Sequence, residues 1–309
     1  TVTICNVNEA KFPTDPNWPR ANSLFAGERS SSDSVADFAL IGIPAHETSL
    51  SATNAHLTPT AIREALARYS TFTISGNIDL RNLSCADLGD VPSPDGAGGE
   101  VKVAAALSGL LGKHKMIVAL GGDNSITYSV AAGLWPDLSK IGLITFDAHH
   151  DLRDGNSNGS PVWRLIQAGL PGTNIVQIGI ADFANSAEYS KRAVESGITV
   201  ISREEMRDNS IVNIVKRALE IAGANGREIY VDLDVDVCDR SVAPACPASL
   251  PGGISADEIR QATRLVASDK RVRAIDITEI DSSMDTPDQR TIRLAALLVL
   301  EAAAGLSSR

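Results

Sequence analysis

The sequence has few of the features that mark secreted, membrane-bound or nucleic-acid-binding proteins. It contains 4 cysteines with no CxxC pair, and their spacing indicates no disulfide framework. No apolar run approaches the roughly 18 residues of a membrane-spanning helix, and the N-terminus lacks the basic-then-apolar pattern of a signal peptide. The net charge of −10 argues against nucleic acid and anionic membranes as partners. These absences predict a reduced, cytoplasmic protein with a small-molecule substrate.

The sequence does contain many short apolar segments, and hydrophobic residues make up 43% of its 309 positions. We expect strands at 38–43, 85–88, 116–120, 141–146, 175–180, 198–201, 229–235 and 272–280. Helices fit between these strands. The first begins near Thr58, with Thr58 as N-cap and Pro59 in the first helical position. The others are expected at 100–111, from the turn 121–125 to about 134, and at 161–168, 185–196, 209–222, 255–268 and 290–305. About eight strands alternating with helices predict a mostly parallel sheet covered on both faces.

The first 36 residues differ from the rest because they are polar and broken by prolines and a serine run. We interpret 1–36 as an N-terminal arm that wraps the domain or mediates subunit contact. Because α/β folds of this length often form one unit, we expect 1–309 to be a single domain.

The most informative stretch follows the apolar run 141–146, which leads directly into Asp147, His149 and Asp151. Alternate residues of an extended chain point to the same side, so these three groups converge if the backbone stays extended. Unpaired charges at the end of a buried strand would cost several kcal/mol. Carboxylates and an imidazole suit a divalent transition metal. The alternative is a solvated loop in which the three groups never meet.

A second acidic cluster weakens that alternative. In the stretch 230–236, strict alternation places Asp232, Asp234 and Asp236 on one strand face. Three carboxylates on one face repel each other unless a cation or hydrogen bonds compensate them. The two clusters together supply enough ligands for two adjacent metals, which can activate a bridging water for hydrolysis.

Two further polar groups fall at predicted strand ends, where sites form in parallel sheets. Asn124 emerges in the turn after 116–120, so its amide oxygen could reach a metal. Glu279 lies on the polar side of an alternating stretch and could hold a cationic nitrogen of a substrate. The alternative for Asn124 is that it only forms a tight turn, and the alternative for Glu279 is that it lies at a solvated strand terminus.

The order of these motifs resembles the arginase/agmatinase/formimidoylglutamase family of ureohydrolases, from about Gly42 to the C-terminus. The motifs are GGDNS at 121–125, DAHHD at 147–151, DVD at 234–236 with SVAP at 241–244, and Glu279. The resemblance implies a three-layer α/β/α fold with an eight-stranded sheet, a dinuclear centre that is usually manganese, and a homo-oligomer, trimeric or hexameric.

The resemblance also implies roles for individual residues. The metal ligands would be Asp147 and Asp234 bridging both ions, His149 and Asp236 on one, and Asp151 and Asn124 on the other. A hydroxide between the metals would attack an amidine or guanidine carbon, with Asp151 and Glu279 as the catalytic carboxylates. Asp232 aligns with a serine of the family and is not expected to be a ligand.

Two departures from the family pattern bear on the substrate. Asn124 replaces a histidine and is a poorer ligand, so one metal site is expected to be weak. Asn158 replaces the histidine that arginases and agmatinases place near the leaving amine. Several stretches, among them 147–153, 176–180 and 243–247, are most similar to bacterial formimidoylglutamases of histidine degradation.

That substrate, N-formimidoyl-L-glutamate, carries two carboxylates and needs cations. Arg153 and Arg164 flank the metal loop and can each grip a carboxylate in a bidentate fork. The alternatives are a surface salt bridge for Arg153 and an exposed charge on a helix face for Arg164. An agmatinase or a guanidino-acid hydrolase such as a guanidinobutyrase is the nearest rival function, and a non-catalytic family member is a more distant one.

Overall fold

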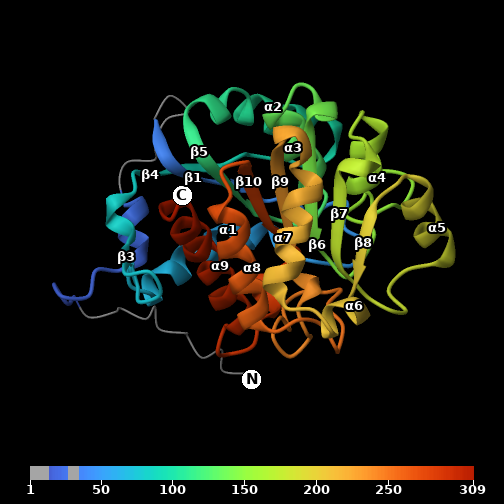
Figure 1. Cartoon of the computed structure of the whole chain (residues 1–309). Helices are drawn as coiled ribbons and strands as arrows, with labels where there is room; N and C mark the ends of the chain where they lie inside the picture. Colours follow the sequence, from blue (N-terminus) through green and yellow to red (C-terminus); the bar gives the residue numbers. More distant parts are fainter. Residues whose placement is uncertain (1–13, 27–34) are drawn as a thin grey trace, which may run out of the picture.

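The computed structural model describes residues 14–26 and 35–309 and contains one central sheet of eight parallel strands. The strand order is β4-β1-β5-β10-β9-β6-β7-β8 (Figure 1). The strands are β1 (Ala36–Ile43), β4 (Cys85–Asp90), β5 (His114–Gly121), β6 (Ile141–Phe146), β7 (Ile175–Ile180), β8 (Thr199–Ser202), β9 (Glu228–Asp234) and β10 (Val272–Thr278). The predicted parallel sheet is therefore confirmed, and β6 and β7 have the predicted bounds.

Helices cover both faces of this sheet, which gives the three-layer architecture that the family resemblance implies. One face carries a core shared with α1 (Thr58–Ala65), α6 (Arg203–Arg207), α7 (Ile211–Ala222), α8 (Ala256–Ser268) and α9 (Arg290–Ser307). The other face packs against α2 (Gly96–Leu107), α3 (Ile126–Leu134), α4 (Pro161–Gln167) and α5 (Ala187–Glu195). Within residues 14–26 and 35–309, no helix has both the length and the apolar character needed to cross a membrane.

The structure corrects several predicted boundaries. Helix α2 begins at Gly96 and ends at Leu107, four residues earlier at each end than the predicted 100–111, because the glycine-rich stretch 96–99 forms its first turn. Thr58 is the first residue of α1 and not its N-cap. The two-stranded antiparallel sheet of β2 (Phe72–Thr73) and β3 (Ile78–Asp79) was not predicted, since strands this short leave no periodic pattern.

The predicted N-terminal arm lies partly outside the described residues. Its described residues are 14–26, 35 and 36, and they include a 3-10 helix, η1 (Ala21–Phe25), with Ala21 fully buried. A β-bridge joins Arg20 to Ser70, so this part of the arm contacts the segment that leads into β2. Whether 1–36 also mediates subunit contact stays a prediction.

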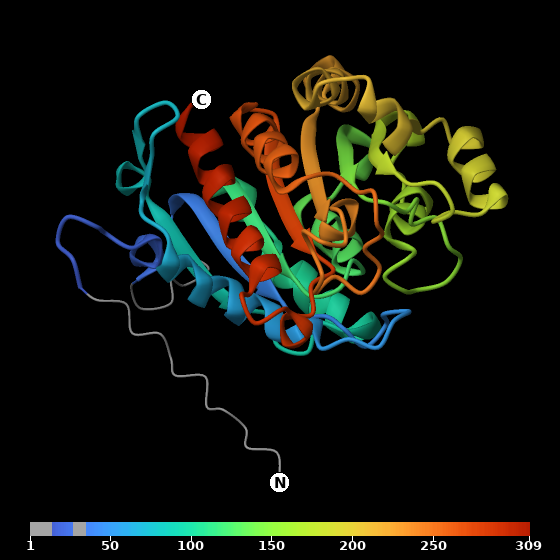
Figure 2. The same ribbon diagram turned by 90° about the horizontal axis from the view of Figure 1, so that it is seen from below.

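The long helices α8 and α9 lie side by side (Figure 2) and are joined by a buried carboxylate. Glu301 of α9 is 6% exposed and accepts hydrogen bonds from Arg260 and Arg264 of α8. Because Glu301→Ala leaves two neighbouring guanidinium groups without this anion, we expect it to lower the free energy of unfolding by about 1–3 kcal/mol. Urea unfolding measures this. A loss well below that range would show that solvent screens the pair.

Candidate metal centre and substrate pocket

The site forms where four neighbouring strands end, namely β5, β10, β9 and β6. Asp147 follows directly after β6, and its backbone N–H donates to the carbonyl of Ile178 in the adjacent strand. The chain is no longer extended beyond this point, and Asp151 has a φ of 52° in the left-handed region. Asp147, His149 and Asp151 are therefore brought together by a loop and not by the alternation of a continued strand.

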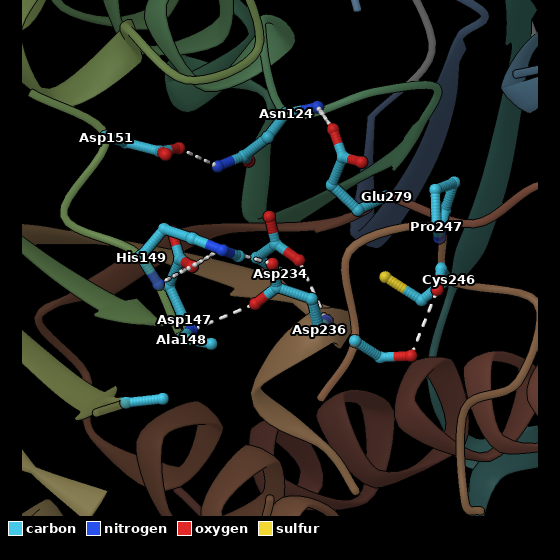
Figure 3. A network of polar contacts seen from close by, with 12 residues as sticks. Asn124, Asp147, Ala148, His149, Asp151, Asp234, Asp236, Cys246, Pro247 and Glu279 are labelled. Atoms are coloured by element: carbon cyan, nitrogen blue, oxygen red, sulfur yellow. Dashed lines mark hydrogen bonds and ion pairs between the residues drawn. The ribbon is translucent and has the colours of Figure 1, made fainter. Parts of the chain in front are cut away.

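The second cluster is also assembled by a turn. Asp234 is the last residue of β9, whereas Asp236 lies in the 3-10 helix η9 (Val235–Val237). The Asp234 carboxylate accepts from the N–H of Asp236, and the Asp236 carboxylate accepts from the N–H of Ala148. The first hydrogen bond holds the turn after β9, and the second joins that turn to the loop after β6 (Figure 3).

Two overlapping groups of side chains could each hold a cation. Ligand atoms of Asp147, His149 and Asp236 lie within 4.8 Å of one another, and so do those of Asp147, Asp151 and Asp234. Asp147 belongs to both groups, which suits a bridging ligand, whereas Asp234 belongs to only one. The five predicted Asp and His ligands thus converge at one place.

The electrostatics of this cluster favour a bound cation. Burial together with mutual repulsion raises the pKa of Asp147 and of Asp234 well above the usual range. Burial likewise raises the pKa of Asp151 to about 7. Burial alone would raise the pKa of Asp236 too, but its ion pair with His149, at 2.6 Å, lowers it overall. The carboxylates need positive charge nearby, and one imidazole does not supply enough.

The structure corrects the prediction that the amide oxygen of Asn124 reaches a metal. This oxygen accepts hydrogen bonds from the hydroxyls of Thr127 and Thr278, both at 2.9 Å. The amide nitrogen points into the site and donates to Asp151 at 2.6 Å. An NH2 group has no lone pair available for a metal. In this arrangement Asn124 orients the carboxylate of Asp151 and is not itself a ligand.

This geometry sets an expectation for metal content. Without a side-chain ligand at position 124, the site around Asp151 should hold its ion more weakly than the site around His149. After mild dialysis, metal analysis should give nearer one ion than two per chain, and Asn124→His should raise the retained amount. Asn174→His, a buried substitution away from the site, serves as the matched control. Two ions that survive a chelator challenge in the unmutated protein would contradict the expectation.

Glu279 occupies the opposite side of the site, after β10, with a φ of 63°. Its carboxylate accepts from the backbone N–H of Asn124 at 2.8 Å and from the Asn158 amide at 2.7 Å. Burial and the nearby Asp123 raise the pKa of Glu279 to about 8. Asn158 in turn accepts from the N–H of Leu50. Left-handed backbone at two non-glycine site residues, Asp151 and Glu279, is the kind of strain that gathers at functional sites.

A cavity of about 320 Å³ opens over these carboxylates. Its lining includes the acidic residues of the two cation groups together with Arg153, Asn185, Ser186 and Tyr189. The guanidinium of Arg153 lies 5.9 Å from the ring of Tyr189. No carboxylate of residues 14–26 or 35–309 forms an ion pair with Arg153. The sequence analysis missed the contribution of the segment that begins α5, because Asn and Ser at a helix start are usual caps and give no functional signal.

Arg164 lies elsewhere, which makes its predicted role in substrate binding wrong. Its guanidinium forms a bidentate pair with Glu100, at 2.8 and 2.9 Å, and stacks 3.7 Å from the ring of Tyr128. It does not line the cavity. The side chain points away along α4 to bind α2 and α3, and a sequence contains no direct sign of that partner.

Asp232 lies below the site in β9, fully buried. It is in register with Asp276 of β10, which accepts from the hydroxyls of Tyr230 and Thr127. Asp232 belongs to neither of the two groups that could hold a cation. That Asp232 is not a ligand stays a prediction.

The fold and this site define a class of hydrolases, and comparison of the sequence agrees. Residues 36–305 match the Arginase family, so the chain belongs to that family. A formimidoylglutamase from Halalkalibacterium halodurans is 35% identical over 275 residues, which cover 86% of this chain and 86% of that protein. The crystal structure of formimidoylglutamase from Bacillus subtilis is 30% identical and superposes with a TM-score of 0.90, covering 96% of this chain and 95% of the other.

A more distant structure shares the fold and contains metal. Trypanosoma cruzi formiminoglutamase with Mn2+2 superposes with a TM-score of 0.84 at 23% identity, covering 94% of this chain and 99% of the other.

Proposed function

We propose that this protein is a manganese-dependent formimidoylglutamase, which hydrolyses N-formimidoyl-L-glutamate to L-glutamate and formamide. The observation that carries the proposal is the juxtaposition, in one cavity, of a buried acidic cluster with Arg153, a cation that forms no ion pair within residues 14–26 and 35–309. The relatives with 30% identity or more described above, from Halalkalibacterium halodurans and Bacillus subtilis, are formimidoylglutamases, which supports the same reaction.

The residues present fit two divalent ions. The ligands would be His149, Asp236 and Asp147 for one ion and Asp147, Asp151 and Asp234 for the other. Oxygen donors with one imidazole suit Mn2+, and two cations would offset the repulsion among the buried carboxylates. When bound, the pair of ions supplies an activated water for attack on the amidine carbon.

Glu279 suits the amidine end of the substrate. A formimidoyl group is planar and basic, and in its protonated form it is a cation with N–H donors. Asn158 and the backbone of Asn124 hold the Glu279 carboxylate in place at the cavity wall. The carboxylate can then accept from the amidinium and orient its carbon toward the metal side. Asp151, oriented by the Asn124 amide, is placed to take a proton from the attacking water and pass it to the leaving amine.

The glutamate end of the substrate needs positive charge, and the lining of the cavity supplies it. Arg153 provides a fork of N–H donors. Asn185 and Ser186 line the same cavity at the start of α5, where the helix dipole also favours an anion. Agmatine has no carboxylate and would gain nothing from these groups, so a carboxylate-free substrate is disfavoured. A non-catalytic role is disfavoured as well, because the five predicted Asp and His ligands are brought together.

The products test this reaction. Incubation of the Mn2+-loaded protein with N-formimidoyl-L-glutamate should release equal amounts of glutamate and formamide. Proton NMR measures both products. Release of ammonia with formation of N-formylglutamate would mean that water attacks the same carbon but a different nitrogen leaves. Absence of both product pairs in fully metal-loaded protein would refute the proposal.

We also propose a cytoplasmic homo-oligomer, trimeric or hexameric, on the strength of the family resemblance. Light scattering coupled to size-exclusion chromatography measures the subunit number, and a monomer at all concentrations would refute this part.

A further inference from the structure

One arginine of α5, Arg192, binds the loop after β6 on both sides of Arg153. Its guanidinium donates to the carbonyl of Leu152, just before Arg153, at 2.7 Å. It also forms a bidentate ion pair with the carboxylate of Asp154, just after Arg153, at 2.9 and 3.3 Å. The ring of Trp163 lies 4.4 Å from the same guanidinium. Arg192 is therefore fixed by several contacts, although it does not line the substrate cavity.

Asp154 is the carboxylate that could compete for Arg153. The two residues are neighbours in the chain, and consecutive Cα atoms are only about 3.8 Å apart. The guanidinium groups of Arg153 and Arg192 both lie close to the ring of Tyr189, at 5.9 and 5.4 Å from its centre. The other two carboxylates between positions 147 and 154 belong to the cation groups of the metal centre. Asp154 is thus shared between two nearby arginines, and it pairs with Arg192.

We propose that Arg192 is a positioning residue, which keeps Arg153 available to the substrate by pairing with Asp154. While that pair is intact, Arg153 forms no ion pair across the described ranges 14–26 and 35–309, and it can hold a substrate carboxylate in its fork of N–H donors. Without Arg192, Asp154 would compete with the substrate for Arg153. The inference rests on the proposed function, because it concerns the cation assigned to the glutamate end of the substrate.

Binding of L-glutamate, the dicarboxylate product, tests this role without a need for turnover. Isothermal titration calorimetry on the Mn2+-loaded full chain measures its Kd in the unmutated protein and in Arg192→Met. Because Asp154 is 73% exposed, solvent screens the competing pair, so we expect Arg192→Met to weaken glutamate binding about three- to fivefold. Adding Asp154→Asn removes the competitor and should restore the affinity to within about twofold of the Asp154→Asn single variant. Arg192→Lys retains the charge and should keep most of the affinity.

A kinetic comparison shows whether Arg192 acts through Arg153. Arg192→Met should lower kcat/KM for N-formimidoyl-L-glutamate through a higher KM, by a factor similar to its effect on glutamate binding. In an Arg153→Ala background the same substitution should have no further effect, because the cation that it protects is gone. Lys191→Met is the matched control, since Lys191 is the neighbouring cation of α5, pairs with Glu195 and does not line the cavity. Its glutamate affinity should equal that of the unmutated protein.

Circular dichroism verifies that each variant folds, and Arg192→Gln replaces Arg192→Met if the latter does not. Unchanged glutamate affinity without Arg192, or a loss that Asp154→Asn does not restore, would overturn the role of Arg192. An unmutated protein that binds no glutamate would overturn it as well. Glutamate binding with the expected pattern, but no release of glutamate and formamide from N-formimidoyl-L-glutamate, would support this role and refute the proposed function.

Discussion

Replacing Asp234 by alanine should lower kcat/KM by about three orders of magnitude or more, and Asp147→Ala should do the same. Each residue belongs to at least one group of side chains that could hold a cation, and Asp147 belongs to both. Losing either carboxylate removes a ligand and also a fixed point of the loop, because Asp234 accepts from the N–H of Asp236 and Asp147 from that of His149. The assay is steady-state hydrolysis of N-formimidoyl-L-glutamate at saturating Mn2+.

Metal-dependent stability supplies a second readout for the same variants. Mn2+ that binds only the folded state should raise the Tm of the unmutated protein, and this rise should shrink in Asp147→Ala and Asp234→Ala. Asp208→Ala, an exposed carboxylate at the end of α6, is the control and should respond like the unmutated protein. Full activity in either site variant, with metal content verified, would contradict the proposal of a dinuclear metal centre.

The second large effect concerns the two arginines near the metal loop, which the structure separates. Arg153→Ala should lower kcat/KM for N-formimidoyl-L-glutamate by roughly one to two orders of magnitude, equivalent to about 1.5–3 kcal/mol for one lost charged contact. Arg164→Ala should leave kcat/KM near that of the unmutated enzyme, because Arg164 is bound to Glu100 and Tyr128 and does not line the cavity. Its cost should appear instead as a lower Tm.

The two substitutions control for each other, since both remove one positive charge from the same stretch of chain. Because Arg153 binds the end of the substrate that does not react, much of its effect should be a higher KM. An Arg153→Ala enzyme that matches its parent on this substrate, or an Arg164→Ala enzyme that loses as much activity, would contradict the placement of the substrate carboxylates.

The parts of the fold that follow from the sequence are those buried on both faces. Strands β6 and β7 are uninterrupted apolar runs with every residue buried, and their bounds are as predicted. Helix α2 was placed four residues late, because Gly96, Gly98 and Gly99 look like a loop, although Gly99 packs against the backbone of Pro94 where no side chain would fit. Tertiary contact overrides local propensity there.

The candidate site shows the same division. The positions of Asp147 and Asp234 at strand ends are readable from alternation, but Asp236 reaches the cluster through a 3-10 turn. The orientation of Asn124 depends on Thr127 and Thr278, and the second of these lies in another strand. The pairing of Arg164 with Glu100 likewise joins segments far apart in the chain. Side-chain partners of this kind are fixed by the packed structure, and no local pattern encodes them.

The most direct test of the proposed function is the ratio of kcat/KM values for N-formimidoyl-L-glutamate, agmatine and arginine, measured side by side on one Mn2+-loaded preparation. A cavity lined by both the acidic ligands and Arg153 predicts that N-formimidoyl-L-glutamate is preferred over both rivals by about two orders of magnitude or more, and that its products are glutamate and formamide. Faster release of urea from agmatine or from arginine would contradict it.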